Sequence, residues 1–153
     1  MTAYSAPLRD ISFALNEMGI LKSVASLPGC EEVNQELTDA IVEEAGKLAR
    51  DVLAPLNATG DQQGATIENG VVRTADGFKD AYKAFVDGGW PGIPFNPDHG
   101  GQGLPWLVTA ATMETWIAAN TAWALGPILT IGAVELLDEH GSPAQKKTYL
   151  PKL

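Results

Sequence analysis

The segment from Trp106 to Leu125 has the sequence WLVTAATMETWIAANTAWAL and decides the fold. Glu114 is its only charged residue. A helix that is apolar on all sides is surrounded by protein rather than placed on a surface. We therefore predict a central helix over these residues. Because proline is tolerated in the first turn of a helix, we predict that the next helix begins at Gly126-Pro127 and ends at His140.

The run from Thr115 to Val134 carries no charge for 20 residues, which is also the length of a membrane span. Polar and turn-forming residues interrupt this run, and acidic residues follow it where a spanning helix usually has aromatic and basic anchors. Two buried core helices, broken at Gly126-Pro127, explain the same residues. We therefore predict no membrane span.

Apolar residues at helical spacing predict two helices in the first third of the chain. The first helix ends at Gly19, and its apolar face comprises Leu8, Ile11, Leu15 and Met18. The second is longer, and its predicted buried stripe comprises Leu37, Ile41, Leu48, Val52 and Leu56. An acidic run, favourable near a helix N-terminus, precedes and enters this helix: Glu31, Glu32, Glu36, Asp39, Glu43 and Glu44. We interpret the run as a solvated face, with a recruited basic partner as the alternative.

The chain changes character between Asn57 and Gly77, where the helical period fails. Residues 66–73, TIENGVVR, predict two short strands around Asn69-Gly70, a dipeptide that tolerates the positive φ angles of a tight hairpin turn. A short helix that ends at Gly88-Gly89 is predicted next, and its aromatic residues are candidate core residues: Phe78, Tyr82 and Phe85.

Ten of the 26 glycine and proline residues lie between Gly88 and Pro105, so we predict a long loop over residues 88–105. A final helix is indicated near the end of the chain. Ser142 can cap it, Pro143 occupies its first position, and Gln145 completes a capping box. Pro151 is predicted to end this helix.

Together these patterns predict a single all-α domain over residues 1–153, with an orthogonal or up-down arrangement of about six helices and one minor β-hairpin. The chain has 10 basic and 19 acidic residues, for a net charge of −9. Proteins that bind nucleic-acid phosphates concentrate lysine and arginine, and this sequence contains no basic cluster. We therefore predict no nucleic-acid partner.

Cys30 is the single cysteine, so an intrachain disulfide is impossible. It also lacks the Cys and His neighbours that a zinc site needs. We interpret it as a small buried or half-buried thiol in a reducing compartment. The first ten residues contain no apolar run of the kind found in secretory signals. We expect a cytoplasmic protein without a metal site.

Few residues are candidates for catalysis. His99 and His140 lie near predicted loop or helix-end positions, with no second histidine at ligand spacing, and we interpret both as solvent-facing or capping residues. A carboxylate in an apolar helix must find a hydrogen-bond partner or take up a proton, so Glu114 is interpreted as a buried structural carboxylate, with a general base as the alternative. The glycine-rich stretch Gly100–Gly103 follows no strand and lacks a Lys-Ser or Lys-Thr ending, which excludes a phosphate loop.

Two motifs together resemble the acyl-CoA dehydrogenase family. The first is Trp90–Pro94 (WPGIP), which leads to His99–Leu104 (HGGQGL) and is similar to a loop of that family. The second is Gly141–Leu153 (GSPAQKKTYLPKL), which is similar to the closing helix of its N-terminal helical domain. The front end, Tyr4–Asp10 (YSAPLRD), is similar to the longer members, including those acting on 3-methylmercaptopropionyl-CoA.

The resemblance implies an enzyme that removes the α and β hydrogens of an acyl-CoA thioester with FAD as cofactor. It also implies two further domains that supply most FAD contacts and the catalytic glutamate, so the chain to Leu153 alone is expected to be inactive. The implied partners are an acyl-CoA substrate, an electron acceptor and further copies of the chain in a homo-oligomer. The resemblance places part of the acyl-chain wall at Ala124, Leu125, Ile128 and Gly132, which are equally interpretable as helix-packing positions.

Two alternatives remain open from the sequence. A stand-alone helical interaction module would bind a partner through surfaces that a complete enzyme would bury. Within the enzyme class, an acyl-CoA oxidase or a flavin monooxygenase of the same fold would differ in residues outside this chain. The acyl-chain specificity also stays open, because Leu125 and Ile128 are aliphatic where some members have polar residues.

Overall fold

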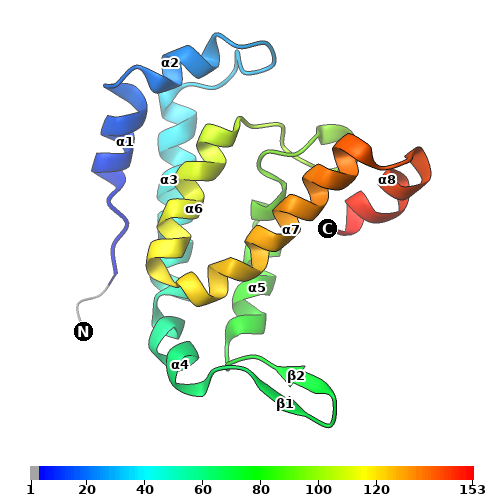
Figure 1. Ribbon diagram of the computed structural model, residues 1–153. Coiled ribbons are helices and arrows are strands. Elements are labelled where there is room, and N and C mark those ends of the chain that lie inside the picture. Colours follow the sequence, from blue (N-terminus) through cyan, green and yellow to red (C-terminus); the bar gives the residue numbers. More distant parts are fainter. Residues whose placement is uncertain (1–3) are drawn as a thin grey trace.

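The structure, a computed structural model, describes residues 4–153 and is built mainly of helices (Figure 1). Over these residues it contains eight α-helices, one π-helical turn and a two-stranded antiparallel hairpin, which confirms the predicted fold class and exceeds the expected six helices. The elements are α1 (Leu8–Asn16), α2 (Ile20–Ala25), α3 (Gln35–Leu48), the π-turn (Ala49–Leu53), α4 (Pro55–Gln63), β1 (Thr66–Glu68), β2 (Val71–Arg73), α5 (Phe78–Asp87), α6 (Trp106–Ala119), α7 (Thr121–His140) and α8 (Pro143–Tyr149).

Helices α3 and α6 lie side by side in the middle of the fold, and α1 packs beside them (Figure 1). The buried residues of α3 and the π-turn are mostly small, and Ala45 and Ala49 are fully buried. Small side chains let the two helix backbones approach closely. The buried stripe predicted for α3 was therefore wrong by one position. Its larger residues are only half-buried and lie beside the contact with α6. The positions that are buried are Thr38, Val42, Ala45, Ala49 and Leu53.

An aromatic cluster joins α5, α6 and α7 in the core. The Trp116 ring meets those of Phe85 and Trp90 edge to face, with centroids 5.1 and 5.3 Å apart. Its indole Nε1 also donates a hydrogen bond of 3.2 Å to the Ala45 carbonyl oxygen of α3. The Trp123 ring also meets Phe85 edge to face, with centroids 5.4 Å apart. Phe85 is therefore a core residue, as predicted, and Phe78 is half-buried against the core, but the prediction was wrong for Tyr82, which is 41% exposed.

The boundary between α6 and α7 lies at Asn120, so the predicted break at Gly126-Pro127 was wrong. The Asn120 side chain is 1% exposed, and its Oδ1 accepts a hydrogen bond from the Trp123 N–H, 3.1 Å away. This contact is an N-cap, and it satisfies a backbone donor at the start of α7. Pro127 consequently lies inside α7 rather than in its first turn.

The π-turn continues α3 into α4 and extends the helical region beyond the predicted limit at Asn57. The Ala54 N–H donates to the Ala49 carbonyl oxygen five residues earlier, at 2.8 Å. The N–H of Asn57 bonds to the Ala54 carbonyl oxygen, three residues earlier, so it does not reach the Leu53 carbonyl oxygen. That oxygen accepts a hydrogen bond from Asn120 Nδ2 instead, 3.2 Å away, which connects the π-turn to the α6–α7 corner.

The first helix is shorter than predicted, since α1 ends at Asn16 rather than at Gly19. Ile11 and Leu15 are buried against α3 and α6, but the two outer members of the predicted face, Leu8 and Met18, are exposed. The predicted hairpin is confirmed, and Ile67 pairs with Val72 across it. Both turn residues have positive φ angles, +52° at Asn69 and +77° at Gly70.

The long loop between α5 and α6 is closed by hydrogen bonds between its two halves. The N–H groups of Gln102, Gly103 and Leu104 donate to the carbonyl oxygens of Gly92, Phe95 and Ile93 at 2.8–2.9 Å. A Cβ atom at Gly101 would lie 2.0 Å from the Phe95 carbonyl oxygen, so only glycine fits this turn. The glycine-rich stretch is therefore a structural turn, as predicted.

After the end of α7, the predicted capping box of Ser142, Pro143 and Gln145 is confirmed, and α8 ends at Tyr149.

Candidate functional site

The candidate site is one face of α7, which holds all four predicted acyl-chain residues. Ala124, Leu125, Ile128 and Gly132 are separated by one, three and four positions. At about 100° per residue, they span roughly 100° of the helix circumference. The structure therefore brings the four to a single face, as helical spacing requires.

Burial changes across this face from the core outward. Ala124 is 1% exposed and belongs to the main hydrophobic core, whereas Leu125 is 56% exposed. Ile128 is half-buried, and Gly132 is exposed with no atom within 4 Å of an added Cβ. Ala124 therefore contributes to packing in this chain, while the other three form an open apolar surface.

The open surface is larger than the predicted set, because two further leucines extend it. Leu129 is 78% exposed and Leu136 is 63% exposed. Leu129, Gly132 and Leu136 lie four, seven and eleven positions after Leu125. At helical spacing, all four residues therefore share one face of α7. That spacing is visible in the sequence and could have identified both residues.

The chemistry of this face is uniform from Leu125 to Gly132, since α7 carries no titratable side chain before Glu135. Aliphatic side chains bind an apolar group by shape and by removal of surface from water, and they discriminate little by hydrogen bonding. The face is therefore suited to one wall of a hydrocarbon-binding channel.

Helix α7 is also long and apolar enough to cross a membrane by length and composition alone. Its most apolar stretch of 18 residues has a mean hydropathy of 1.2, and 22% of that stretch is buried. The prediction of two buried core helices over this region was therefore wrong in two respects: α7 is continuous through Pro127, and much of its surface lies open.

The three titratable candidates do not form a catalytic group. Glu114 lies on the exposed side of α6, so its predicted burial was wrong: this helix is not enclosed on every side. His140 is exposed at the end of α7, as predicted. His99 is half-buried in a 3-10 turn of the long loop.

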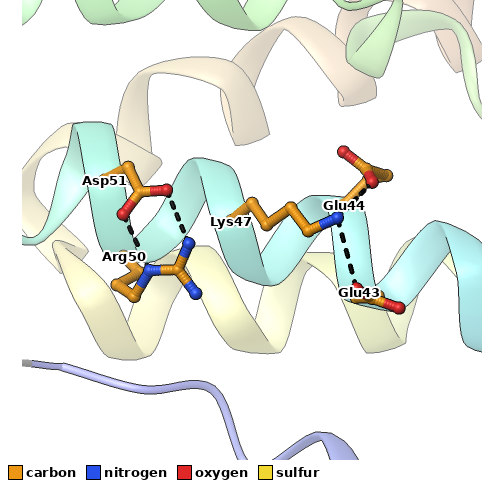
Figure 2. A network of polar contacts seen from close by, with 5 residues as sticks. All are labelled: Glu43, Glu44, Lys47, Arg50 and Asp51. Carbon is orange, nitrogen blue, oxygen red and sulfur yellow. Dashed lines mark hydrogen bonds and ion pairs between the residues drawn. The ribbon is translucent and has the colours of Figure 1, made fainter.

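Two residues of the acidic run, Glu43 and Glu44, pair with Lys47 of the same helix, and Arg50 and Asp51 of the π-turn pair with each other (Figure 2). Lys47 Nζ lies 3.2 Å from Glu43 Oε1 and 2.6 Å from Glu44 Oε1. Arg50 donates two hydrogen bonds of 2.7 Å to the carboxylate of Asp51. All five side chains are largely exposed, so these ion pairs add little to stability.

The same contacts shift the pKa values of these groups. Hydrogen bonds to Glu44 and Glu43 raise the pKa of Lys47, and the Arg50 guanidinium lowers the pKa of Asp51. Elsewhere, burial and the charge of Glu114 raise the pKa of Tyr4, whose hydroxyl donates to the Thr115 carbonyl oxygen at 2.9 Å. None of these groups lies on the open face of α7.

Among residues 4–153, no three His, Cys, Asp or Glu side chains are grouped to hold a metal ion. Cys30 is a free, half-buried thiol, as predicted.

Comparison with known proteins identifies the family. The family model for the acyl-CoA dehydrogenase N-terminal domain matches residues 35–153. The chain belongs to this family. It is 41% identical, over 98% of its length, to a 3-methylmercaptopropionyl-CoA dehydrogenase from Ruegeria pomeroyi. It is also 28% identical, again over 98% of its length, to a butyryl-CoA dehydrogenase from Syntrophomonas wolfei.

These relatives are oxidoreductases by name, and the chain spans only about a quarter of their length: 26% of the first and 25% of the second. The matched domain begins at α3, so α1 and α2 lie before it. The two relatives nevertheless match nearly the whole chain, including these two helices, which agrees with the resemblance of the front end to longer members.

Proposed function

We propose that the chain is the N-terminal part of an FAD-dependent acyl-CoA dehydrogenase that forms a double bond between the α and β carbons of an acyl-CoA thioester. The family match supports this assignment. The open aliphatic face of α7 is the observation that supports a role for this chain in binding the acyl group. Similarity to enzymes over 98% of the chain favours this function over a stand-alone interaction module.

Within that enzyme, α7 supplies one wall of the acyl-chain channel. Leu125, Ile128 and Gly132 would contact the chain, and Ala124 would support the wall from the core side. Because all four are small or aliphatic, the length and width of the acyl group are read by shape. The names of the relatives favour a short acyl or thioether group as substrate.

The open face of α7 does not fit an FAD site or a proton-abstracting base. The open face of α7 presents Leu125, Leu129 and Leu136, none of which can hydrogen-bond a flavin ring or accept a proton. The proposal therefore assigns cofactor binding and proton abstraction to polypeptide beyond this chain. The complete enzyme would also need an electron acceptor. We further propose a homo-oligomer located in the cytoplasm, where the free thiol of Cys30 would remain reduced.

We expect a purified chain of residues 1–153 to bind no FAD and to oxidise no acyl-CoA. The physical reason is the absence of flavin-binding and basic groups on the open face of α7. Flavin absorbance after incubation with FAD, and turnover with an artificial electron acceptor, measure the two properties. The full-length protein is the positive control and should turn yellow and reduce the acceptor. Turnover by the short chain would contradict the assignment of the reactive groups, while an inactive full-length protein would contradict the function itself.

We expect Gly132→Leu in the full-length enzyme to lower kcat/KM for the longest accepted acyl-CoA at least about tenfold relative to the shortest. Position 132 has open space around an added Cβ, and leucine is a better helix former than glycine, so the fold should tolerate it. The new side chain would occupy the volume proposed for the distal acyl carbons.

Gly126→Leu is the matched control for this experiment. Gly126 is also an exposed glycine of α7 with open space, but it lies about 120° around the helix from Gly132. The ratio of kcat/KM for long and short acyl-CoA should stay unchanged in this variant. Equal ratios in both variants would show that this face of α7 does not line the channel.

A further inference from the structure

Helix α7 is anchored to the core mainly at its beginning. Of its four buried residues, the first three lie within its first two turns: Trp123, Ala124 and Pro127. The fourth, Val134, lies nearer the other end. Because the anchored part is short, the direction of the whole helix depends on how its first turn is held. The position of the proposed acyl-chain wall depends on that direction as well.

Asn120 holds the first turn of α7 to the rest of the fold with all four of its polar atoms. Its N–H donates to the Trp116 carbonyl oxygen of α6 at 2.9 Å, and its carbonyl oxygen accepts from the Ala124 N–H at 3.0 Å. Its side chain accepts from the Trp123 N–H through Oδ1 and donates through Nδ2 to the Leu53 carbonyl oxygen. Asn120 therefore connects the π-turn to the corner at which α6 and α7 meet (Figure 1).

The acceptor at Leu53 is available because of the π-turn. The N–H of Asn57 bonds to the Ala54 carbonyl oxygen, which leaves the Leu53 oxygen to the Asn120 side chain. Turns of this kind are rare, and they occur frequently at functional sites. Leu53 is 0% exposed and Asn120 is 1% exposed, so bulk water does not replace the bond when one partner is removed. The contact is therefore a specific connection between two irregular points of the fold.

We propose that Asn120 is a positioning residue for the acyl-chain wall and that it acts through its hydrogen bond to Leu53. This inference rests on the function proposed above. The bond fixes the first turn of α7, whereas Leu125 and Leu129 further along are 56% and 78% exposed and pack little against the fold. Without the bond, α7 pivots at its N-terminus. Asn120 touches no substrate in this scheme and acts only through the helix that it holds.

The length of the helix amplifies a small pivot. At about 1.5 Å per residue, Gly132 lies roughly 18 Å along the axis from Asn120, so a tilt of about 5° moves it by about 1.5 Å. A displacement of about 1 Å in a group that positions a substrate can change a rate by as much as about 100-fold. An aliphatic wall distinguishes acyl groups by shape alone, so its position sets which acyl groups fit.

Asn120→Ser in the full-length enzyme separates this role from helix capping. Serine is also a preferred N-cap residue, but its shorter side chain does not reach the Leu53 carbonyl oxygen. We expect the ratio of kcat/KM for the longest and the shortest accepted acyl-CoA to change at least about threefold. Asn120→Thr is the second variant, because threonine also caps and fills more of the space that asparagine occupies. It should change the ratio in the same direction.

Asn34→Ser is the matched control. Asn34 caps α3 through the Leu37 N–H, but its side chain is exposed, and its other hydrogen bond goes to the nearby Glu32 carbonyl oxygen. The ratio should stay unchanged in this variant. A merely structural role for Asn120 predicts a lower Tm in Asn120→Ser and Asn120→Thr with the wild-type ratio, and that result in folded protein would overturn the proposal.

Crystal structures of the full-length wild-type protein and of Asn120→Ser test the positioning without relying on activity. We expect α7 to remain helical, with the Cα atom of Gly132 displaced by about 1 Å or more relative to α3 and α6. An undisplaced α7 would overturn the proposal. A wild-type enzyme that oxidises no acyl-CoA would instead contradict the proposed function, and the two crystal structures would still decide whether Asn120 positions α7.

Discussion

Replacing Trp116 by alanine should lower the free energy of unfolding by about 3–5 kcal/mol, the largest effect we expect from a single substitution in this chain. The Trp116 side chain is 2% exposed and contacts the rings of Phe85 and Trp90 edge to face. Its removal leaves a large cavity and deprives the Ala45 carbonyl oxygen of its indole donor. Urea denaturation followed by circular dichroism measures the change.

Trp106→Ala is the control for Trp116→Ala. Trp106 belongs to the same helix but is 46% exposed, and its ring contacts Phe95 at the edge of the fold, with centroids 6.2 Å apart. Its removal should cost no more than about 1.5 kcal/mol. Similar losses in the two variants would mean that the aromatic cluster around Trp116 does not organise the core.

Asn120→Ala should lower the free energy of unfolding by about 2–4 kcal/mol. The substitution removes the N-cap of α7, which typically costs about 1 kcal/mol. It also removes the donor to the buried Leu53 carbonyl oxygen, and an unsatisfied buried group costs a further 1–3 kcal/mol or so. Urea denaturation measures the loss, and native-state hydrogen exchange should show increased opening at the first turn of α7.

Asn34→Ala separates the two contributions. Asn34 caps α3 in the same way, since its Oδ1 accepts from the Leu37 N–H at 3.0 Å, but its side chain is exposed. We expect a loss of about 0.5–2 kcal/mol, the range for an ordinary cap. If Asn120→Ala cost no more than Asn34→Ala, the contact with Leu53 would contribute nothing to stability.

Elements specified by neighbouring residues could be predicted from the sequence. The hairpin needs only Asn69-Gly70, because these two residues alone accept the positive φ angles of the turn. The capping box likewise needs only Ser142 and Gln145, three positions apart. In both cases all the interactions that form the element lie within a few residues of one another.

The α6–α7 boundary could not be placed reliably, because a long-range contact favours it. Gly126-Pro127 is the stronger helix breaker in the sequence. Asn120 was nevertheless a detectable candidate, since asparagine is a preferred N-cap residue. What the sequence does not reveal is that the Leu53 carbonyl oxygen, 67 residues away, accepts a hydrogen bond from the same side chain.

The phase of α3 was missed for a different reason. Hydrophobic periodicity gives weight to large side chains, so it selected Ile41 and Leu48 over Ala45 and Ala49. In the structure α6 approaches the small residues, and the large ones pack around the edge of the contact. Which residues of α3 are buried depends on the surface of α6 as well, and the sequence pattern of α3 alone does not describe that surface.

For the candidate site, the sequence could predict that the acyl-chain residues share one face of a helix, but it could not predict how far that face is buried. The spacing of Leu125, Ile128 and Gly132 on any helix places them together. Their exposure depends on how α7 diverges from α6, and that in turn depends on the corner at Asn120 and on the loop between α5 and α6.

The π-turn has a consequence for how this domain accommodates changes in chain length. Adding or deleting one residue in an ordinary helix rotates everything after it by about 100°. Between Ala49 and Leu53 the wider turn already absorbs one extra residue, so α3 keeps its register against α6 while α4 keeps a separate one. A homologue lacking that residue would continue α3 as a regular helix, in which the Leu53 carbonyl oxygen bonds to the N–H four residues later and Asn120 loses its acceptor. Residue number at the π-turn and the identity of position 120 should therefore vary together during evolution.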